Sequence, residues 1–96
     1  MASGVIKEIN PSHTLGTAVS LVNYTSSNKY TAPRDGYAIA SVWANDTTVS
    51  VHFDGKLEIS LSYSKQPTLC LFVKRGLQVW TDINGSNRSV NFYPIN

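Results

Sequence analysis

The strongest constraint on the fold is the alternation of apolar and polar side chains through residues 48–63, on both sides of an Asp54-Gly55 pair. In residues 48–53 the apolar side chains occupy every second position, and residues 57–63 repeat the pattern. A period of two places the apolar side chains on one face of a β-strand. Asp-Gly is a strong signal for a two-residue hairpin turn. The segment therefore predicts an antiparallel hairpin with one buried face and one face in water.

The rest of the chain continues this pattern of short strands and turns, without a helical period of useful length. Regular spacing of short strands is typical of an antiparallel sandwich or barrel. We expect a lead-in segment over residues 1–17, in which Val5, Ile6 and Ile9 form a short strand or pack on the domain. A single all-β sandwich domain follows over residues 18–96. Besides the hairpin, its predicted strands cover residues 18–24, 29–31, 36–43, 68–73, 77–83 and 88–93.

Two of the predicted strands, residues 36–43 and 68–73, are apolar on both faces. Such a strand must be covered on both sides, but a small two-sheet sandwich covers only the inner faces of its strands. We expect the outer faces to meet either another copy of the chain or a long loop. The small side chains of Ala38 and Ala40 would let a neighbouring subunit approach closely. The predicted subunit contacts are Tyr37, Ala38, Ala40, Val42, Cys70 and Phe72.

The composition agrees with association between chains. Charged residues make up 15% of the sequence, against about 25% in a typical soluble domain. The only cysteine is Cys70, which excludes an internal disulfide. A net charge of +2 is too small to indicate a nucleic-acid partner, and no apolar run is long enough to indicate insertion into a membrane. The first residues lack the features of a secretory signal, so we expect synthesis in a cytosol.

No pattern in the sequence predicts a catalytic, metal or cofactor site. His13 and His52 are the only side chains that titrate near neutral pH, and neither has a nucleophile at a supporting spacing. Cys70 lies in an apolar strand and is expected to be a buried, inert thiol. The aspartates lie in or beside turns, where their side chains bond to nearby backbone groups. We therefore expect a protein that is not an enzyme and that needs no cofactor.

Trp80 is the most prominent candidate for contact with a ligand. It shares a strand face with Gln78 and Asp82, opposite Leu77, Val79 and Ile83. Tryptophan combines a large apolar ring with a polar N–H group, so it is common at interfaces and on surfaces where sugars stack. The sequence therefore predicts a ligand platform or an interface at Trp80, Gln78 and Asp82.

Three segments, in this order, resemble small head domains of phage tail fibres and virion fibres. They are residues 30–37 (YTAPRDGY), 71–76 (LFVKRG) and 89–94 (SVNFYP). Leu77 departs from the pattern, because the family often has Asp after the glycine. The resemblance covers residues 18–94 and implies a jelly-roll sandwich that assembles as a homotrimer, similar to the trimeric heads of the tumour-necrosis-factor and C1q folds.

The same resemblance implies a function and a location. The chain would be a non-enzymatic virion protein, a fibre knob or decoration module, made in the host cytoplasm and assembled into the particle. Its partners would be further copies of itself, other virion proteins and a glycan of the bacterial surface. A carbohydrate-binding module is the alternative, since the same fold can present aromatic and Asn or Asp side chains to a sugar.

Overall fold

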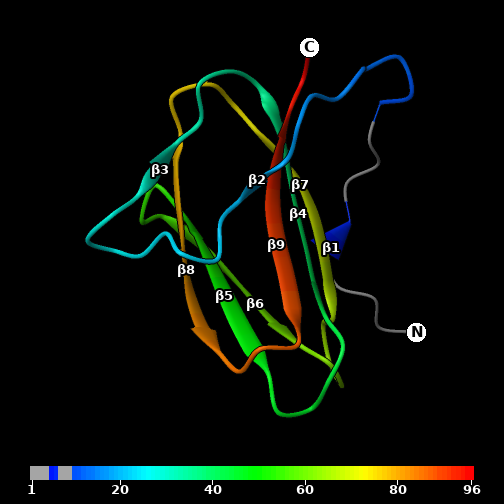
Figure 1. The fold of residues 1–96 in the computed structure, drawn as a ribbon, viewed down its shortest axis with the longest axis vertical. Helices are drawn as coiled ribbons and strands as arrows, with labels where there is room; N and C mark the ends of the chain where they lie inside the picture. Colours follow the sequence, from blue (N-terminus) through cyan, green and yellow to red (C-terminus); the bar gives the residue numbers. More distant parts are fainter. Residues whose placement is uncertain (1–4, 7–9) are drawn as a thin grey trace.

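The computed structural model describes residues 5–6 and 10–96, which form two β-sheets packed face to face (Figure 1). The five-stranded sheet has the order β1-β7-β4-β9-β2, and the four-stranded sheet has the order β3-β8-β5-β6. The strands are β1 (Val5–Ile6), β2 (Val19–Ser20), β3 (Tyr30–Thr31), β4 (Gly36–Val42), β5 (Thr48–Phe53), β6 (Leu57–Ser62), β7 (Thr68–Val73), β8 (Gln78–Asn84) and β9 (Arg88–Pro94).

The antiparallel strand pairs are nested along the chain. The hairpin strands β5 and β6 pair with each other, β4 pairs with β7, β3 pairs with β8, and β2 pairs with β9. In the sequence, the pair β5–β6 is therefore innermost, β4–β7 and β3–β8 lie outside it in turn, and β2–β9 is outermost. Among the strands of the described residues, β1 alone pairs in parallel, with β7.

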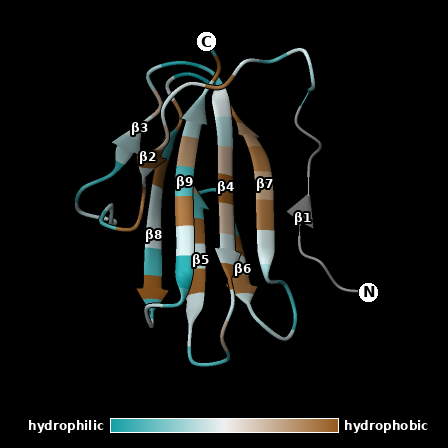
Figure 2. Cartoon of the chain, turned by 45° about the vertical axis from the view of Figure 1, so that its right-hand side comes forward, coloured by the Kyte–Doolittle hydropathy of each residue, from teal (hydrophilic) through white to brown (hydrophobic). Residues whose placement is uncertain are grey.

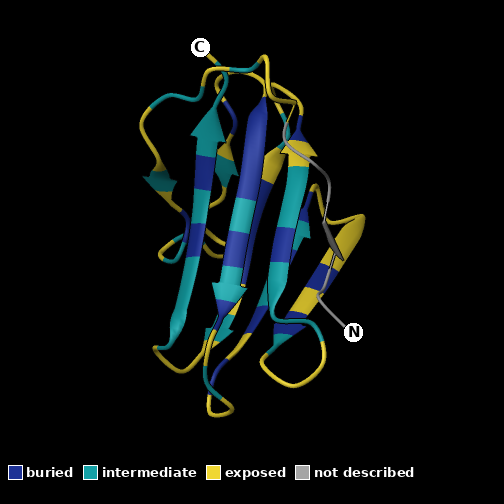
Figure 3. Cartoon of the chain, turned by 90° about the vertical axis from the view of Figure 1, so that its right-hand side faces the viewer, coloured by how far each residue is buried: buried dark blue, intermediate teal, exposed yellow. Residues whose placement is uncertain are grey.

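The core lies between the two sheets and consists of the inward side chains of both. Figure 2 shows hydrophobic residues recurring along β4, β7, β8 and β9. From the hairpin, the predicted apolar face of Val49, Val51 and Phe53 points inward, and each of these residues is at most 4% exposed. Figure 3 shows the resulting alternation of buried and less buried residues along the strands of the five-stranded sheet. The prediction of an all-β antiparallel sandwich is confirmed.

Asp54 and Gly55 have the φ angles of the predicted turn, but Phe53 pairs with Leu57, so three residues and not two connect β5 and β6. Asp54 has φ of 55° and Gly55 has φ of 69°, so both central residues lie in the left-handed region. A type I′ turn requires this at both positions, and its twist matches that of the flanking strands. Asp54 also accepts a hydrogen bond from the amide of Gln78, at 2.7 Å between Oδ1 and N. The Asp54 side chain therefore ties the turn to the start of β8.

Two predictions near the N-terminus are refined. Of residues 18–24, only Val19–Ser20 forms a strand, and it lies at the edge of the five-stranded sheet. In the lead-in segment, Val5–Ile6 forms a short strand, which was one of the two alternatives that we expected. Ile9 lies outside the described residues. No helix suited to crossing a membrane occurs in the described part of the chain.

The predicted orientation of β4 is wrong. Ala38, Ala40 and Val42 are 1–3% exposed and belong to the core of the single chain, so they are not available to a neighbouring subunit. Phe92 pairs with Ala38 in the sheet register, and its ring atom Cζ lies 2.5 Å from where a Cβ on Gly36 would be. At Gly36 the inner face of β4 has no room for a side chain, because the Phe92 ring occupies that space.

Candidate functional site

The outer side of the five-stranded sheet is a surface that we call the β4–β7–β9 face. Because side chains alternate along a strand, the residues between the inward positions of β4, β7 and β9 point outward here. Among the described strand residues of these three strands, none that points outward carries a charge. The face consists of Tyr37, Ile39, Ser41, Thr68, Cys70, Phe72, Ser89, Asn91 and Tyr93.

Large apolar side chains are exposed at both ends of the β4–β7–β9 face. Phe72 is 45% exposed near the end of β7, and Trp43, which follows β4, is 52% exposed. Between them Ile39, Cys70 and Asn91 are partly buried. Interface cores between proteins are depleted in charge and enriched in aromatic residues. The β4–β7–β9 face has both properties.

Tyr37 belongs to this face but is closed off by the N-terminal segment. It is 4% exposed. Its hydroxyl oxygen lies 2.9 Å from Nδ1 of His13 and accepts a hydrogen bond from the amide of Asn10 at 3.3 Å. Its ring also packs edge-on against Phe72, with 5.8 Å between the ring centroids. Residues 10–13 therefore supply part of the cover that the apolar outer face of β4 requires. Because these residues already cover Tyr37, its predicted role as a subunit contact does not agree with the structure.

Cys70 lies on β7 in the middle of the β4–β7–β9 face, where sequence alternation placed it. It is a free thiol and is partly buried. Desolvation by this burial raises the pKa of the thiol, because the charged thiolate is disfavoured away from water. A raised pKa lowers the fraction of thiolate at neutral pH, so Cys70 lacks the lowered pKa that activates a nucleophilic thiol.

Trp80 is on the outer face of the four-stranded sheet, as predicted, but its ring is not free. It is 7% exposed. The His52 ring stacks on it with 5.1 Å between centroids and 4° between planes, and Lys29 Nζ lies 4.5 Å from its centroid. Lys29 immediately precedes β3 and His52 lies on β5, the two strands that flank β8. Because these neighbours cover the ring, Trp80 cannot serve as an open platform for a sugar.

His52 links this cluster to two carboxylates. Its Nε2 lies 2.9 Å from Asp82 Oδ2 and 4.0 Å from Glu58 Oε2. The neighbouring hydroxyl of Ser50 is bonded to Ser60, with 3.2 Å between the oxygens. Asp82 and Trp80 thus come together as the sequence predicted, but His52 engages both. Together these contacts connect three neighbouring strands, β6, β5 and β8.

Asp35 and Asp46 lie in loops between strands, as the sequence predicted, but their hydrogen bonds reach across the fold to Arg75 and Asn87. Asp82 does not fit the prediction, because it lies within β8. Asp35 accepts a hydrogen bond from the amide of Arg75, with 2.8 Å between Oδ1 and N. Hydrogen bonds from Asn87 and Thr47 lower the pKa of Asp46, because they favour its charged form. Within residues 5–6 and 10–96, no group of three His, Cys, Asp or Glu side chains could hold a metal ion.

Sequence analysis missed Ile39, Asn91 and Tyr93 as members of the outward face. Residues 36–43 are uncharged on both faces, so the sequence alone does not show which of the two faces points outward.

Comparisons with protein-family models, with curated proteins and with solved structures found no match for this chain.

Proposed function

We propose that this chain is a non-enzymatic structural module with a jelly-roll fold that assembles with copies of itself. The nested pairing of β2 with β9, β3 with β8, β4 with β7 and β5 with β6 supports the jelly roll, in which eight strands wrap as two Greek keys into a double sheet. Such sandwiches occur as capsid and lectin domains, where loops and faces bind partners and no reaction is needed.

The observation that carries the assembly proposal is the contrast between the two outer faces. The outer face of the four-stranded sheet bears Glu58, Asp82 and His52, whereas the described outward strand residues of the β4–β7–β9 face bear no charge. The β4–β7–β9 face also exposes Phe72 at one end, with Trp43 beyond the other. Since the same patch is present on every copy, a second and third copy are the partners that such a surface fits.

The number of subunits and the setting come from the resemblance to fibre heads. A threefold arrangement would place three β4–β7–β9 faces around one axis. We propose on this basis that the protein is a homotrimeric fibre knob or decoration module of a phage particle, assembled there after synthesis in the host cytoplasm. Other virion proteins and the bacterial surface would then be its further partners.

Mass in solution tests the assembly. Light scattering and sedimentation of the wild type should give the mass of a trimer, and Ile39→Glu should give smaller species, because it places a charge in the middle of the β4–β7–β9 face. Thr31→Glu is the matched control, since Thr31 is exposed on the four-stranded sheet. A wild type that stays monomeric at high concentration, or an Ile39→Glu variant of unchanged mass, would refute the proposal.

A further inference from the structure

The end of the sandwich where β3, β7 and β9 finish carries a concentration of positive charge. Four of the seven Lys and Arg side chains among residues 10–96 lie in the turns at this end. Arg34 follows β3, Lys56 lies in the β5–β6 turn, and Lys74 and Arg75 follow β7. Hydrogen bonds join these turns, since Gly76 donates to the carbonyl of Ala32 at 2.8 Å. The cations are therefore brought together by the fold, although they are dispersed in the sequence.

Within residues 5–6 and 10–96 these cations have no ion-pair partner. None of the Lys and Arg side chains of residues 10–96 forms an ion pair in the structure. The two carboxylates at the same end, Asp35 and Asp54, each accept a backbone N–H, from Arg75 and from Gln78. They hold the turns in place, and the cations outnumber them. An exposed cluster of this kind attracts anions.

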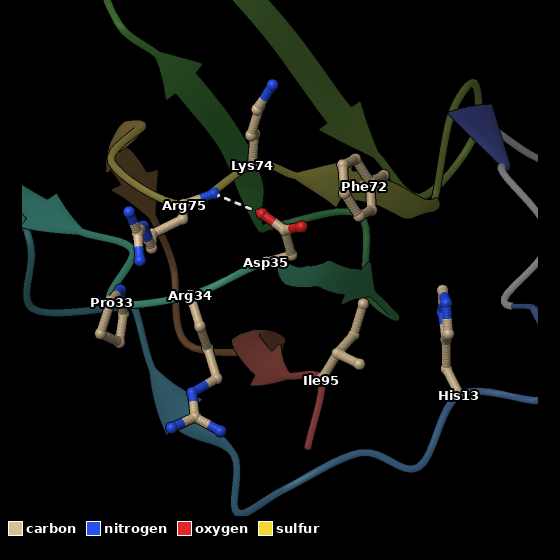
Figure 4. Close-up of a pocket in the computed structure, with 8 residues that line it drawn as sticks. All are labelled: His13, Pro33, Arg34, Asp35, Phe72, Lys74, Arg75 and Ile95. Carbon is tan, nitrogen blue, oxygen red and sulfur yellow. Dashed lines mark hydrogen bonds between the residues drawn. The ribbon is translucent and has the colours of Figure 1, made fainter.

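Three of the cations, Arg34, Lys74 and Arg75, border a depression of about 840 Å³. Small-molecule sites commonly have volumes of about 300–1,000 Å³. Apolar side chains also line it, those of Pro33, Phe72 and Ile95. In Figure 4 the side chains of Arg34, Lys74 and Arg75 extend in different directions around Asp35, with Phe72 and His13 on the other side. Cations that diverge in this way do not converge on one small ion, but they can reach acidic groups spaced along a longer ligand.

We propose that this end of the sandwich binds an acidic oligosaccharide, a sugar chain whose units carry carboxylate, sulfate or phosphate groups. Sugar rings have an apolar face that can pack against Phe72, Pro33 or Ile95, while their acidic groups meet Arg34, Lys74 and Arg75. The proposal does not rest on trimer formation, because the cations lie in turns outside the β4–β7–β9 face. Phe72 borders both surfaces, so the tests use the cations alone.

The number of cations at this end and the shape of the depression favour an acidic sugar over nucleic acid or a membrane. A protein held to nucleic acid by about six to ten phosphate contacts would need more cations than this end offers, because the end has four cations beside two side-chain carboxylates. A flat membrane surface would meet the cations but could not enter the depression between Pro33, Phe72 and Ile95. An oligosaccharide can use both the charge and the concave apolar lining.

Calorimetric titration with defined hexasaccharides tests the site. Hexagalacturonate supplies carboxylates, a heparin hexasaccharide supplies mainly sulfates, and maltohexaose is the neutral control. At least one acidic hexasaccharide should bind at least about tenfold more tightly than maltohexaose, and the tighter of the two identifies the acidic group. Lys74→Gln and Arg34→Gln should each weaken binding by roughly threefold, the size expected for an exposed charge contact. Sodium chloride at about 1 M should remove most of the binding by screening.

Lys65→Gln is the matched control, because Lys65 lies in the turn between β6 and β7 at the opposite end. It should leave the affinity unchanged, and thermal melting should show that all three variants are folded. Equal affinity for acidic and neutral sugars would overturn the proposal. So would an equal loss in Lys65→Gln, or tighter binding to single-stranded oligothymidylate or to phosphatidylserine vesicles. Light scattering on the same samples separates this result from assembly, since a monomer that binds would refute only the trimer.

Discussion

Ala38 and Ile39 are neighbours on β4 that point to opposite sides of the five-stranded sheet. Ala38 is 1% exposed in the core, and Ile39 is partly buried on the β4–β7–β9 face. We expect Ala38→Glu to unfold the protein and Ile39→Glu to leave it folded but dissociated. We choose Ala38 and not Ala40 for this substitution because Ala40 has a cation nearby. Ala40 pairs with Val90, and Arg88 lies two residues from Val90 on β9. Arg88 Nε is buried without a hydrogen-bond partner in the described structure and could pair with a new carboxylate.

The burial of Ala38 sets the size of the effect. Its neighbours in the sheet are Leu71 and Phe92, which offer no polar partner in their side chains. A buried, unpaired carboxylate costs several kcal/mol even after relaxation, and the added side-chain volume costs about 1–3 kcal/mol more. A domain of this length is stable by about 5–14 kcal/mol. Ala38→Glu should therefore remove most or all of the free energy of unfolding.

Ile39→Glu should behave differently, because the carboxylate can reach water once the subunits of the proposed oligomer separate. Loss of part of the burial of one isoleucine costs about 1–2 kcal/mol. Circular dichroism during denaturation by urea measures the stability of both variants, and sedimentation measures their mass. The reasoning is refuted if Ala38→Glu melts like the wild type, or if Ile39→Glu is unfolded while Ala38→Glu remains a folded oligomer.

Two further predictions concern single residues. Gly36→Ala should lower the free energy of unfolding by about 1–3 kcal/mol, because a Cβ there would meet the carbonyl of Tyr93 and the Phe92 ring. Gly76→Ala is the control, because a Cβ there meets no neighbouring atom and is disfavoured only by the φ of 92°. It should melt at a higher temperature than Gly36→Ala. The reverse order would contradict the close packing at Gly36. Because burial raises the pKa of Cys70, its alkylation by iodoacetamide should reach its plateau at higher pH than that of free cysteine. A plateau at the same or lower pH would show that Cys70 is not desolvated.

Much of the fold could be predicted because the decisive information is local. The bounds of β5 and β7 agree with the predicted ones, and the Asp54-Gly55 turn has the φ angles that its sequence demands. The edge strand β2 was predicted less well. In residues 18–24 apolar side chains predict seven strand residues, but the structure keeps only two at the edge of the sheet. Leu21 is fully buried without belonging to a strand, so its apolar character reflects the core and not the local conformation.

The candidate sites depended on contacts between strands that are distant in the sequence. Alternation correctly placed Trp80, Gln78 and Asp82 on one face of β8. It could not show that Lys29 and His52 would cover the Trp80 ring, because the strands that bring them there are not adjacent to β8 in the chain. The cluster of cations has the same origin, since Arg34 and Lys74 are brought together by the pairing of turns.

The orientation of β4 shows which information the sequence of a doubly apolar strand lacks. Residues 36–42 alternate small with larger side chains, and either set could face inward by hydrophobicity alone. The size of the side chains determines which set faces inward, because an inward residue must leave room for its neighbour across the core or in the sheet. Phe92 is that neighbour, since its ring fills the space above Gly36 and beside Ala38. With the small set facing inward, Ile39 must face outward beside Cys70. The packing of Phe92 thus favours the orientation of β4 in which Ile39 points outward, where the proposed assembly would contact it.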